Sequence, residues 1–348
     1  MITRLAVRNF KSLRELEVEF GRLTVIVGPN GCGKSSVLQA IELLRDLAVG
    51  EDFKPSPSVL SRPASGQAPV HELFARAEFG SGKHVQNTLI LQGGELNPKD
   101  LFEFDSSAAA ELFERVQLYR LDRVVMEQPA YSEEANPTVG PRGEHLAAVL
   151  DALQGTWPEH FDTIESGLRE LVPGLRRVRL PRVKLEVRRE VLVGDQFRMV
   201  KDSAVGHQIT LDFEFAQGIA ADQASEGTIL LLGLLTVIGA EPGPPTTIML
   251  DDLDRGLHPK AQKQLIGHLR QLLDRRPDLQ ILATTHSPYL VEHLAYDEVL
   301  AMTQSPDDGR SLAAPLADHP DAERWREEMS AGEFWSSVGE DWLQARGG

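Results

Sequence analysis

The sequence predicts an α/β fold with a mixed central sheet, an antiparallel β subdomain and a helical insertion. Short apolar runs of strand length, such as 23–27 and 247–250, alternate with segments of helical periodicity, such as 260–273. A glycine-rich loop joins the first of these runs to a helix that begins at Lys34. Within 101–220 this pattern gives way to helices and long alternating strands, which indicates an insertion into the α/β core.

Each element is predicted from its local pattern of apolar residues. Alternating polarity predicts two paired antiparallel strands at 2–9 and 14–20, and further strands within 71–93 and 178–215. The pair Gly194-Asp195 offers a hairpin turn in the second of these regions. Apolar residues at helical spacing predict helices over 108–118, 143–171, 229–238 and 260–273. Short apolar runs predict buried strands over 247–250, 280–283 and 298–302.

These elements group into four expected regions. They are an N-terminal lobe with the glycine loop (1–100), an inserted helical and β-strand region (101–220), a C-terminal lobe (221–303) and an acidic segment with three tryptophans (304–348).

Composition limits the class of protein. The 348 residues are 41% hydrophobic and 25% charged, as in an ordinary soluble domain. A net charge of −16 argues against unspecific nucleic-acid binding by the whole surface, although a local basic patch stays open. One cysteine excludes an intrachain disulfide. The longest apolar run, 229–240, is too short for a bilayer, and the first residues lack a signal sequence. We therefore expect a cytoplasmic protein without membrane contact.

The run from Gly28 to Ser36 carries the strongest chemical signal. It reads GPNGCGKSS and fits the pattern G-x-x-x-x-G-K-[ST] between an apolar strand and a helix. That geometry directs backbone N–H groups and a helix N-terminus at a polyphosphate, with Lys34 on the β and γ oxygens and Ser35 on Mg²⁺. A ligand-free glycine turn is the alternative, which this full context disfavours. The expected contacts to the nucleoside triphosphate are Asn30, Gly31, Cys32, Gly33, Lys34, Ser35 and Ser36.

Two further apolar strands deliver polar residues at their C-terminal ends. Asp251 follows the strand 247–250, the usual position of a carboxylate that holds Mg²⁺, and Asp252 would orient the attacking water. His286 follows the strand 280–283 and can hydrogen-bond a γ-phosphate. Turn-capping aspartates and a loop histidine are the purely structural alternatives.

Ser225 and Gly227 open the apolar helix over 229–238. Ser225 at an N-cap position satisfies free backbone amides, and this role alone would explain it. The functional alternative is that this helix N-terminus presents Ser225 and the Gly227 amide to a second phosphate.

Taken together, these segments resemble the ABC-class ATPases of the RecF/SMC-like and OLD-like branch, including small AAA-type ATPases. The similar text is NFKSL from Asn9, GPNG from Gly28, SEGT from Ser225, DRGLHP from Asp254 and TTHSP from Thr284. Weaker similarity covers 119–122, 143–150 and 333–340.

The resemblance implies a P-loop NTPase with an ABC-type head that binds ATP and Mg²⁺ and hydrolyses ATP. It makes Lys34, Asp251, Asp252 and His286 catalytic, and Ser35 and Asp251 the metal ligands. It also implies a head-to-tail homodimer in which Ser225 of one subunit faces the γ-phosphate held by Lys34 of the other.

Three departures from the family pattern qualify these expectations. Glutamate and proline usually follow the Walker B aspartate, whereas this chain has Asp252 and Leu253. The lost methylene shortens the reach by roughly 1.5 Å, and misplacement by ~1 Å costs ~10²-fold in rate, so we expect slow hydrolysis. Gln67 and Gln86 are weak candidates for the Q-loop glutamine. Only 62 residues follow His286, so we expect no Toprim nuclease domain within this chain.

Eight basic residues lie between Arg169 and Arg189, and they raise the question of a partner. Arg176, Arg177, Arg179 and Arg182 could bind nucleic-acid phosphates, although a solvated sheet face is the more common meaning of such a run. The first hypothesis is an ATP-gated dimer acting on nucleic acid, in repair or phage defence, with a separate effector. The second is a regulatory ATPase that binds only a protein. A transporter subunit is the third, against which the SEGT and LHP segments argue.

Overall fold

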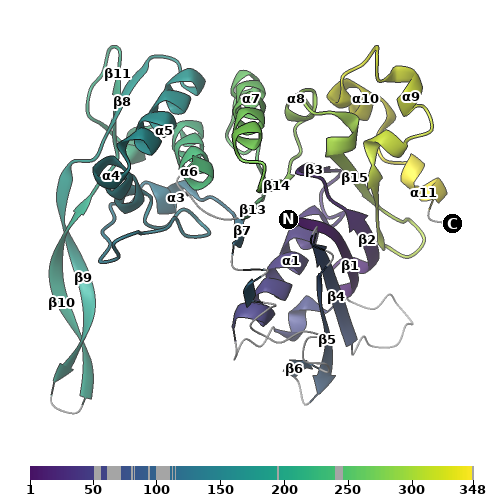
Figure 1. Cartoon of the computed structure of the whole chain (residues 1–348), viewed down its shortest axis with the longest axis horizontal. Helices are drawn as coiled ribbons and strands as arrows, with labels where there is room; N and C mark the ends of the chain where they lie inside the picture. The colour runs from purple at the N-terminus through teal and green to yellow at the C-terminus, as the bar shows by residue number, and fades with distance from the viewer. Residues whose placement is uncertain are drawn as a thin grey trace. The chain divides into compact units, whose positions relative to one another are not determined.

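The computed structural model describes two compact units (Figure 1), each assembled from separate stretches of the chain. The first unit comprises Met1–Leu118, Gly243–Asp254 and Ile266–Gly348, and the second comprises Tyr119–Pro242 and Arg255–Leu265. The residues that the structure describes are 1–50, 56–60, 72–79, 81, 83–92, 95–98, 110–111, 113, 115–193, 196–239 and 246–346.

A six-stranded sheet forms the centre of the first unit, in the order β16-β15-β3-β14-β13-β7. Strand β3 runs parallel to β14 and β15, and β14 runs parallel to β13, whereas β16 is antiparallel to β15. Every residue of β3 is buried, as expected of a parallel strand covered on both faces. The strands are β3 (Leu23–Val27), β7 (Val116–Tyr119), β13 (Thr246–Leu250), β14 (Leu279–Thr284), β15 (Val299–Gln304) and β16 (Ser311–Pro315).

The predicted helix over 108–118 is confirmed at 110, 111 and 113, which are helical, and strand β7 corrects its C-terminal end. Residues 116–119 form an edge strand of the core sheet beside β13. Val116 and Leu118 are buried while Gln117 and Tyr119 are partly exposed, which is the two-residue period of a strand. Pairing in the core therefore overrode the helical pattern read from the sequence.

A five-stranded antiparallel sheet, in the order β2-β1-β4-β5-β6, accompanies the core sheet. Its first two strands confirm the pair predicted at 2–9 and 14–20. The strands are β1 (Ile2–Phe10), β2 (Leu13–Glu19), β4 (Glu72–Phe79), β5 (His84–Gln92) and β6 (Glu95–Pro98).

One buried glutamine connects both sheets of this unit. The Nε2 group of Gln280 donates to the carbonyl oxygens of Ile2 (2.6 Å) and Gly21 (2.9 Å). Its Oε1 atom accepts from the amide of Ile2 at 2.8 Å and from the hydroxyl of Thr247 at 2.9 Å. All hydrogen-bonding atoms of the amide are therefore satisfied, as a buried polar group requires.

The helices of the first unit follow the strands. Helix α1 begins directly after the glycine loop, and its apolar side packs into the core cluster of this unit. The helices are α1 (Lys34–Val49), α8 (Pro288–Val291), α9 (Ala322–Trp325), α10 (Ala331–Val338) and α11 (Trp342–Arg346); helix α7 (Pro259–Arg275) has residues in both units. Short 3₁₀ turns are η1 (Pro57–Val59), η3 (Tyr296–Glu298) and η4 (Leu316–Asp318).

The second unit combines helices with a small sheet and a long hairpin. Helices α4 (Leu146–Thr156) and α5 (Pro158–Leu171) confirm the helical prediction over 143–171, broken at Trp157. The strands are β8 (Leu175–Arg179), β9 (Arg182–Val193), β10 (Gln196–His207), β11 (Thr210–Phe213) and β12 (Ile219–Ala220). The remaining elements are α3 (Arg123–Met126), η2 (Ala221–Gln223) and α6 (Glu226–Gly239).

Strands β9 and β10 pair antiparallel over their whole length, which confirms the predicted hairpin. Its expected turn residues, Gly194 and Asp195, lie outside the described residues. Among the helices that the structure describes, none is both long enough and apolar enough to cross a bilayer.

Candidate nucleotide site

Three neighbouring parallel strands of the core sheet deliver the predicted site residues. The glycine loop follows β3, Asp251 follows β13, and His286 lies two residues beyond β14, the strand between them. Carboxyl ends of parallel strands meet at one edge of a sheet, where α/β proteins bind their ligands. The first unit therefore gathers the loop, both carboxylates and the histidine at a single edge.

The phosphate loop contains three glycines with positive φ angles, which glycine adopts more readily than other residues. Gly28, Gly31 and Gly33 have φ values of 141°, 81° and 112°. A Cβ on Gly28 would also lie 2.0 Å from the carbonyl oxygen of Met302 in β15. Both the loop conformation and its contact with β15 therefore require glycine at position 28.

Lys34 lies at the start of α1 and is only 5% exposed. Its ammonium donates to the carbonyl oxygens of Gly28 at 2.8 Å and Pro29 at 2.9 Å. Burial lowers the pKa of Lys34, while Cys32, Asp252 and Asp251 act in the opposite direction. The ammonium thus lies within the loop, where phosphate oxygens can replace these carbonyls as its acceptors.

Ser35 and Asp251 meet directly, although 216 positions separate them in the sequence. The Ser35 hydroxyl donates to Asp251 Oδ1 at 2.8 Å, and the Thr284 hydroxyl donates to the same oxygen at 2.7 Å. Two oxygen ligands of the kind that Mg²⁺ prefers are therefore adjacent.

Asp252 has a left-handed backbone conformation, with φ at 58°. Aspartate tolerates this region better than most residues. Its amide donates to the Thr284 hydroxyl at 2.8 Å. Burial and the neighbouring Asp251 carboxylate raise the pKa of Asp252, and His286 and Lys34 partly oppose this.

His286 is exposed at the same edge, and Asp254 fixes its backbone. Asp254 Oδ1 accepts from the Thr285 hydroxyl at 2.5 Å and from the His286 amide at 3.2 Å. The imidazole is thus on the surface of the site, where it can meet a ligand.

The other predicted loop residues differ in exposure. Asn30 and Gly31 are exposed at the loop tip, whereas Cys32 and Gly33 are buried beneath it. Ser35 and Ser36 are partly buried in the first turn of α1. Burial raises the pKa of the Cys32 thiol, mainly by desolvating the thiolate.

Ser225 and Gly227 belong to the second unit, where they open α6. The Ser225 hydroxyl accepts from the Thr228 amide at 3.2 Å, so it does cap this helix. A Cβ on Gly227 would lie 2.5 Å from the carbonyl oxygen of Gly256, which has a φ of 67°. The exposed start of α6 is therefore packed closely against the segment that follows the Walker B strand.

Comparison with known proteins shows what this arrangement is similar to. Residues 1–107 match the family "AAA ATPase domain", and residues 160–292 match "AAA domain, putative AbiEii toxin, Type IV TA system". Among solved structures, the Smc head bound to the C-winged helix domain of ScpA is similar, with a TM-score of 0.61. It is 16% identical, and the match covers 90% of this chain and 96% of that one.

Three curated relatives carry the same signal. An OLD nuclease of Thermus scotoductus is 43% identical over 61 residues (15% of this chain, 12% of the relative). A DNA replication and repair protein RecF of Magnetococcus marinus is 37% identical over 86 residues (22% of each). A DNA double-strand break repair Rad50 ATPase of Methanopyrus kandleri is 31% identical over 202 residues (55% of this chain, 22% of the relative). The matches therefore span only 12–22% of these relatives' own lengths.

The two family matches and these relatives support an ABC-class ATPase of the RecF/SMC-like, OLD-like branch. Its similarity to the Smc head and its P-loop sheet confirm the predicted fold class.

Ser35 and Asp251 are the residues of this site that could hold a metal ion. Their two oxygens suit Mg²⁺, which binds through few protein ligands and completes its shell with phosphate and water. Bound Mg²⁺ would neutralise charge on the phosphates. In the described part of the chain, no group of three or more His, Cys, Asp or Glu side chains could hold a metal ion.

Some residues of the predicted basic stripe form ion pairs with nearby carboxylates. Arg176 forms an ion pair with Glu214 at 2.9 Å, and Arg179 forms one with Asp212. Arg177 and Arg182 are exposed on β8 and β9. Half of the four predicted arginines are thus engaged in local ion pairs.

Sequence reasoning missed two residues of the site. Thr284 contacts both aspartates, and Asp254 holds the backbone of the histidine loop. Both residues lie inside segments that resemble the family, and this position could have marked them as candidates. Their contacts, however, are visible only in the fold. Of the Q-loop candidates, Gln86 lies in β5, and Gln67 lies outside the described residues.

Proposed function

We propose that the chain binds ATP with Mg²⁺ at the phosphate loop and hydrolyses it slowly as a nucleotide-gated switch. The observation that carries this proposal is the contact of Ser35 with Asp251, which lies beside Lys34, Asp252 and His286 at one sheet edge. When ATP binds, the Lys34 ammonium exchanges its hydrogen bonds to the loop carbonyls for hydrogen bonds to phosphate oxygens. The Asp252 carboxylate orients the attacking water, and His286 donates to the γ-phosphate.

The switch works through an ATP-dependent, head-to-tail homodimer. Ser225 is exposed at the start of α6, where free helix amides favour an anionic ligand. In the dimer, Ser225 and the Gly227 amide of one subunit contact the γ-phosphate bound to Lys34 of the other. Loss of that phosphate on hydrolysis removes this contact and separates the subunits.

Dimerisation is tested by size-exclusion chromatography of Asp252→Asn, which should bind ATP without turning it over. We expect a dimer with Mg-ATP and a monomer with Mg-ADP. Ser225→Arg in the same background should stay monomeric while ATP binding, measured separately by equilibrium dialysis, persists. A monomer that holds ATP at every protein concentration tested would contradict the dimer and leave the nucleotide site intact.

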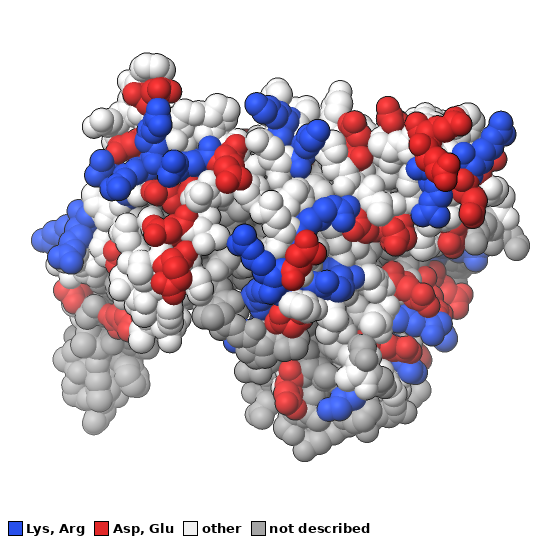
Figure 2. Space-filling view, turned by 45° about the horizontal axis from the view of Figure 1, so that its top comes forward, with Lys and Arg blue, Asp and Glu red and all other residues white. Residues whose placement is uncertain are grey.

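We further propose that the ATP-bound dimer acts on DNA, with a separate effector protein. The named roles of the RecF and Rad50 relatives in DNA repair support this proposal. So do the basic residues of β8 and β9: Figure 2 shows Lys and Arg side chains gathered over the second unit, beside acidic ones.

The test is binding to double-stranded DNA with and without ATP, at two salt concentrations. Arg177→Glu/Arg182→Glu is the informative variant, because Arg176 and Arg179 already pair with Glu214 and Asp212. Neutralised phosphates make binding salt-dependent, so the variant should bind more weakly with a shallower salt slope. Wild-type protein that dimerises with ATP but never binds DNA would favour the regulatory ATPase with a protein partner.

A further inference from the structure

The phosphate loop is held from outside by the C-terminal strand pair of the same unit. The Ser311 hydroxyl, at the start of β16, donates to the carbonyl oxygen of Cys32 at 2.6 Å. The side-chain amide of Gln304, at the end of β15, donates to the carbonyl oxygen of Gly31 at 2.9 Å. Two successive carbonyls of the loop are thus bound by side chains more than 270 positions away.

These two hydrogen bonds fix the direction of the backbone amides that follow the carbonyls, as well as the carbonyls themselves. In a trans peptide, the C=O of one residue and the N–H of the next share a plane and point in opposite directions. No cis peptide occurs among the described residues. Holding the carbonyls of Gly31 and Cys32 toward β15 and β16 therefore directs the amides of Cys32 and Gly33 the other way. Those amides belong to the set that cradles a phosphate.

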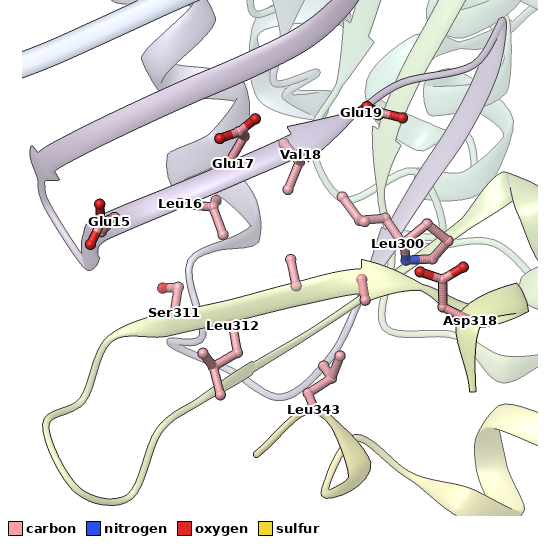
Figure 3. A pocket seen from close by; sticks show the side chains of 13 residues that line it. Glu15, Leu16, Glu17, Val18, Glu19, Leu300, Ser311, Leu312, Asp318 and Leu343 are labelled. Carbon is pink, nitrogen blue, oxygen red and sulfur yellow. The ribbon is translucent and has the colours of Figure 1, made fainter. Parts of the chain in front are cut away.

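The contact is closely fitted as well as hydrogen-bonded. Ser311 is 1% exposed, and a Cβ on Gly33 would lie 2.7 Å from its hydroxyl oxygen. Strand β16 is the edge of the core sheet, and a groove of about 580 Å³ lies between it and β2 (Figure 3).

We propose that Ser311 and Gln304 are positioning residues of the nucleotide site, which orient the Cys32 and Gly33 amides toward the phosphates by binding the carbonyls of Gly31 and Cys32. This deepens the proposed function, since it assumes that the loop binds a nucleotide. Neither residue touches the nucleotide. Both act before it binds, by setting the shape of the loop.

The single cysteine of the chain provides a readout that needs no activity. Cys32 lies within the loop and is 1% exposed, so it should react slowly with a thiol reagent while the loop is held. We expect Ser311→Ala, which removes the donor to the buried Cys32 carbonyl, to speed labelling by Ellman's reagent about 5- to 20-fold. Gln304→Glu removes the donor to the exposed Gly31 carbonyl and should speed labelling less, about 2- to 5-fold. Dissociation constants for Mg-ADP and Mg-ATP should both rise by a similar factor, because the amides serve both ligands.

Ser336→Ala is the matched control, because its hydroxyl donates to the carbonyl of Gly332 at 2.7 Å within α10, not to the loop. It should leave labelling and affinity unchanged. Labelling rates and dissociation constants within twofold of wild type in both loop variants would overturn the proposal. The proposal would also be overturned if the increase in labelling rate were fully explained by a lower free energy of unfolding, measured for the same variants in urea. If wild-type protein binds no nucleotide while the variants still label faster, the proposed function is wrong. The result would still show that Ser311 and Gln304 hold the conformation of the loop.

Discussion

At the scale of single residues, Asp252 combines an unusual backbone with a demanding position. Its φ of 58° suits aspartate, and its amide is fixed by Thr284. Burial and Asp251 raise the pKa of its carboxyl. A carboxylate one methylene shorter than that of glutamate gives a physical reason for the slow hydrolysis that we propose, because reach and alignment govern how well a base orients water.

We predict that Asp252→Glu hydrolyses ATP about tenfold faster, because the added methylene restores reach. The same change should lower the free energy of unfolding by ~1 kcal/mol, since glutamate tolerates the left-handed region less well. Phosphate release and urea denaturation measure the two effects.

Asp252→Asn keeps the backbone preference without the base, so its turnover should fall ~10²-fold or more. A glutamate variant no faster than wild type would rule out reach as the limit.

At the scale of elements, the start of α6 depends on how closely two backbones approach. Only glycine at 227 leaves room for the carbonyl of Gly256. Beside this contact, Glu226 forms an ion pair with Arg255 at 3.5 Å. Ser225 caps the same turn. The exposed helix end proposed for phosphate binding is thus held on several sides within its own unit.

Gly227→Ala should destabilise the protein by ~1–3 kcal/mol, the usual effect of overpacking. Gly155→Ala is the control, because Gly155 lies in the last turn of α4 and a Cβ there meets nothing within 4 Å. Alanine's higher helix propensity should make that variant more stable by ~0.5 kcal/mol. Equilibrium unfolding in urea measures both, and equal effects of the two substitutions would refute the packing argument.

The C-terminal helices carry a pH-sensitive contact. The ring of His319 packs edge-on against Phe334 and Trp342, at centroid distances of 5.1 Å each. Its Nδ1 accepts from the Asp321 amide at 3.0 Å, which requires an unprotonated Nδ1. Burial lowers the pKa of His319 below 6.5, and Asp321 opposes this.

Because the folded state disfavours the charged ring, its stability is full above pH ~6.5 and falls as pH drops toward the folded pKa. Wild-type protein should therefore lose more unfolding free energy between pH 7.5 and 5.5 than His319→Gln. Urea unfolding followed by tryptophan fluorescence at each pH measures the free energy of unfolding of both proteins. If the free energy of unfolding fell equally with pH in the two proteins, His319 would not be the source of the pH dependence.

At the scale of the whole molecule, local sequence predicted where the candidate site residues lie, but not which distant residues contact them. The residues from Gly28 to Ser36, Asp251 and His286 were predictable because each follows an apolar strand in its own segment. Ser311 and Gln304 were not, because a serine and a glutamine in a strand pair have no pattern that indicates a loop far away. Residues 116–118 were wrongly predicted as helix for the same reason, since the neighbour that makes them a strand, β13, lies over 120 positions later.

The order of strands in the core sheet has a consequence for synthesis of the chain on the ribosome. Val25 of β3 pairs with Ala283 on one side and Val299 on the other. At about 5–20 residues per second, β3 emerges roughly 13 to 50 s before either neighbour exists. During that interval an apolar strand and its glycine loop have no sheet to join. The nucleotide site can therefore form only late in translation, and the nascent chain is the state most exposed to aggregation.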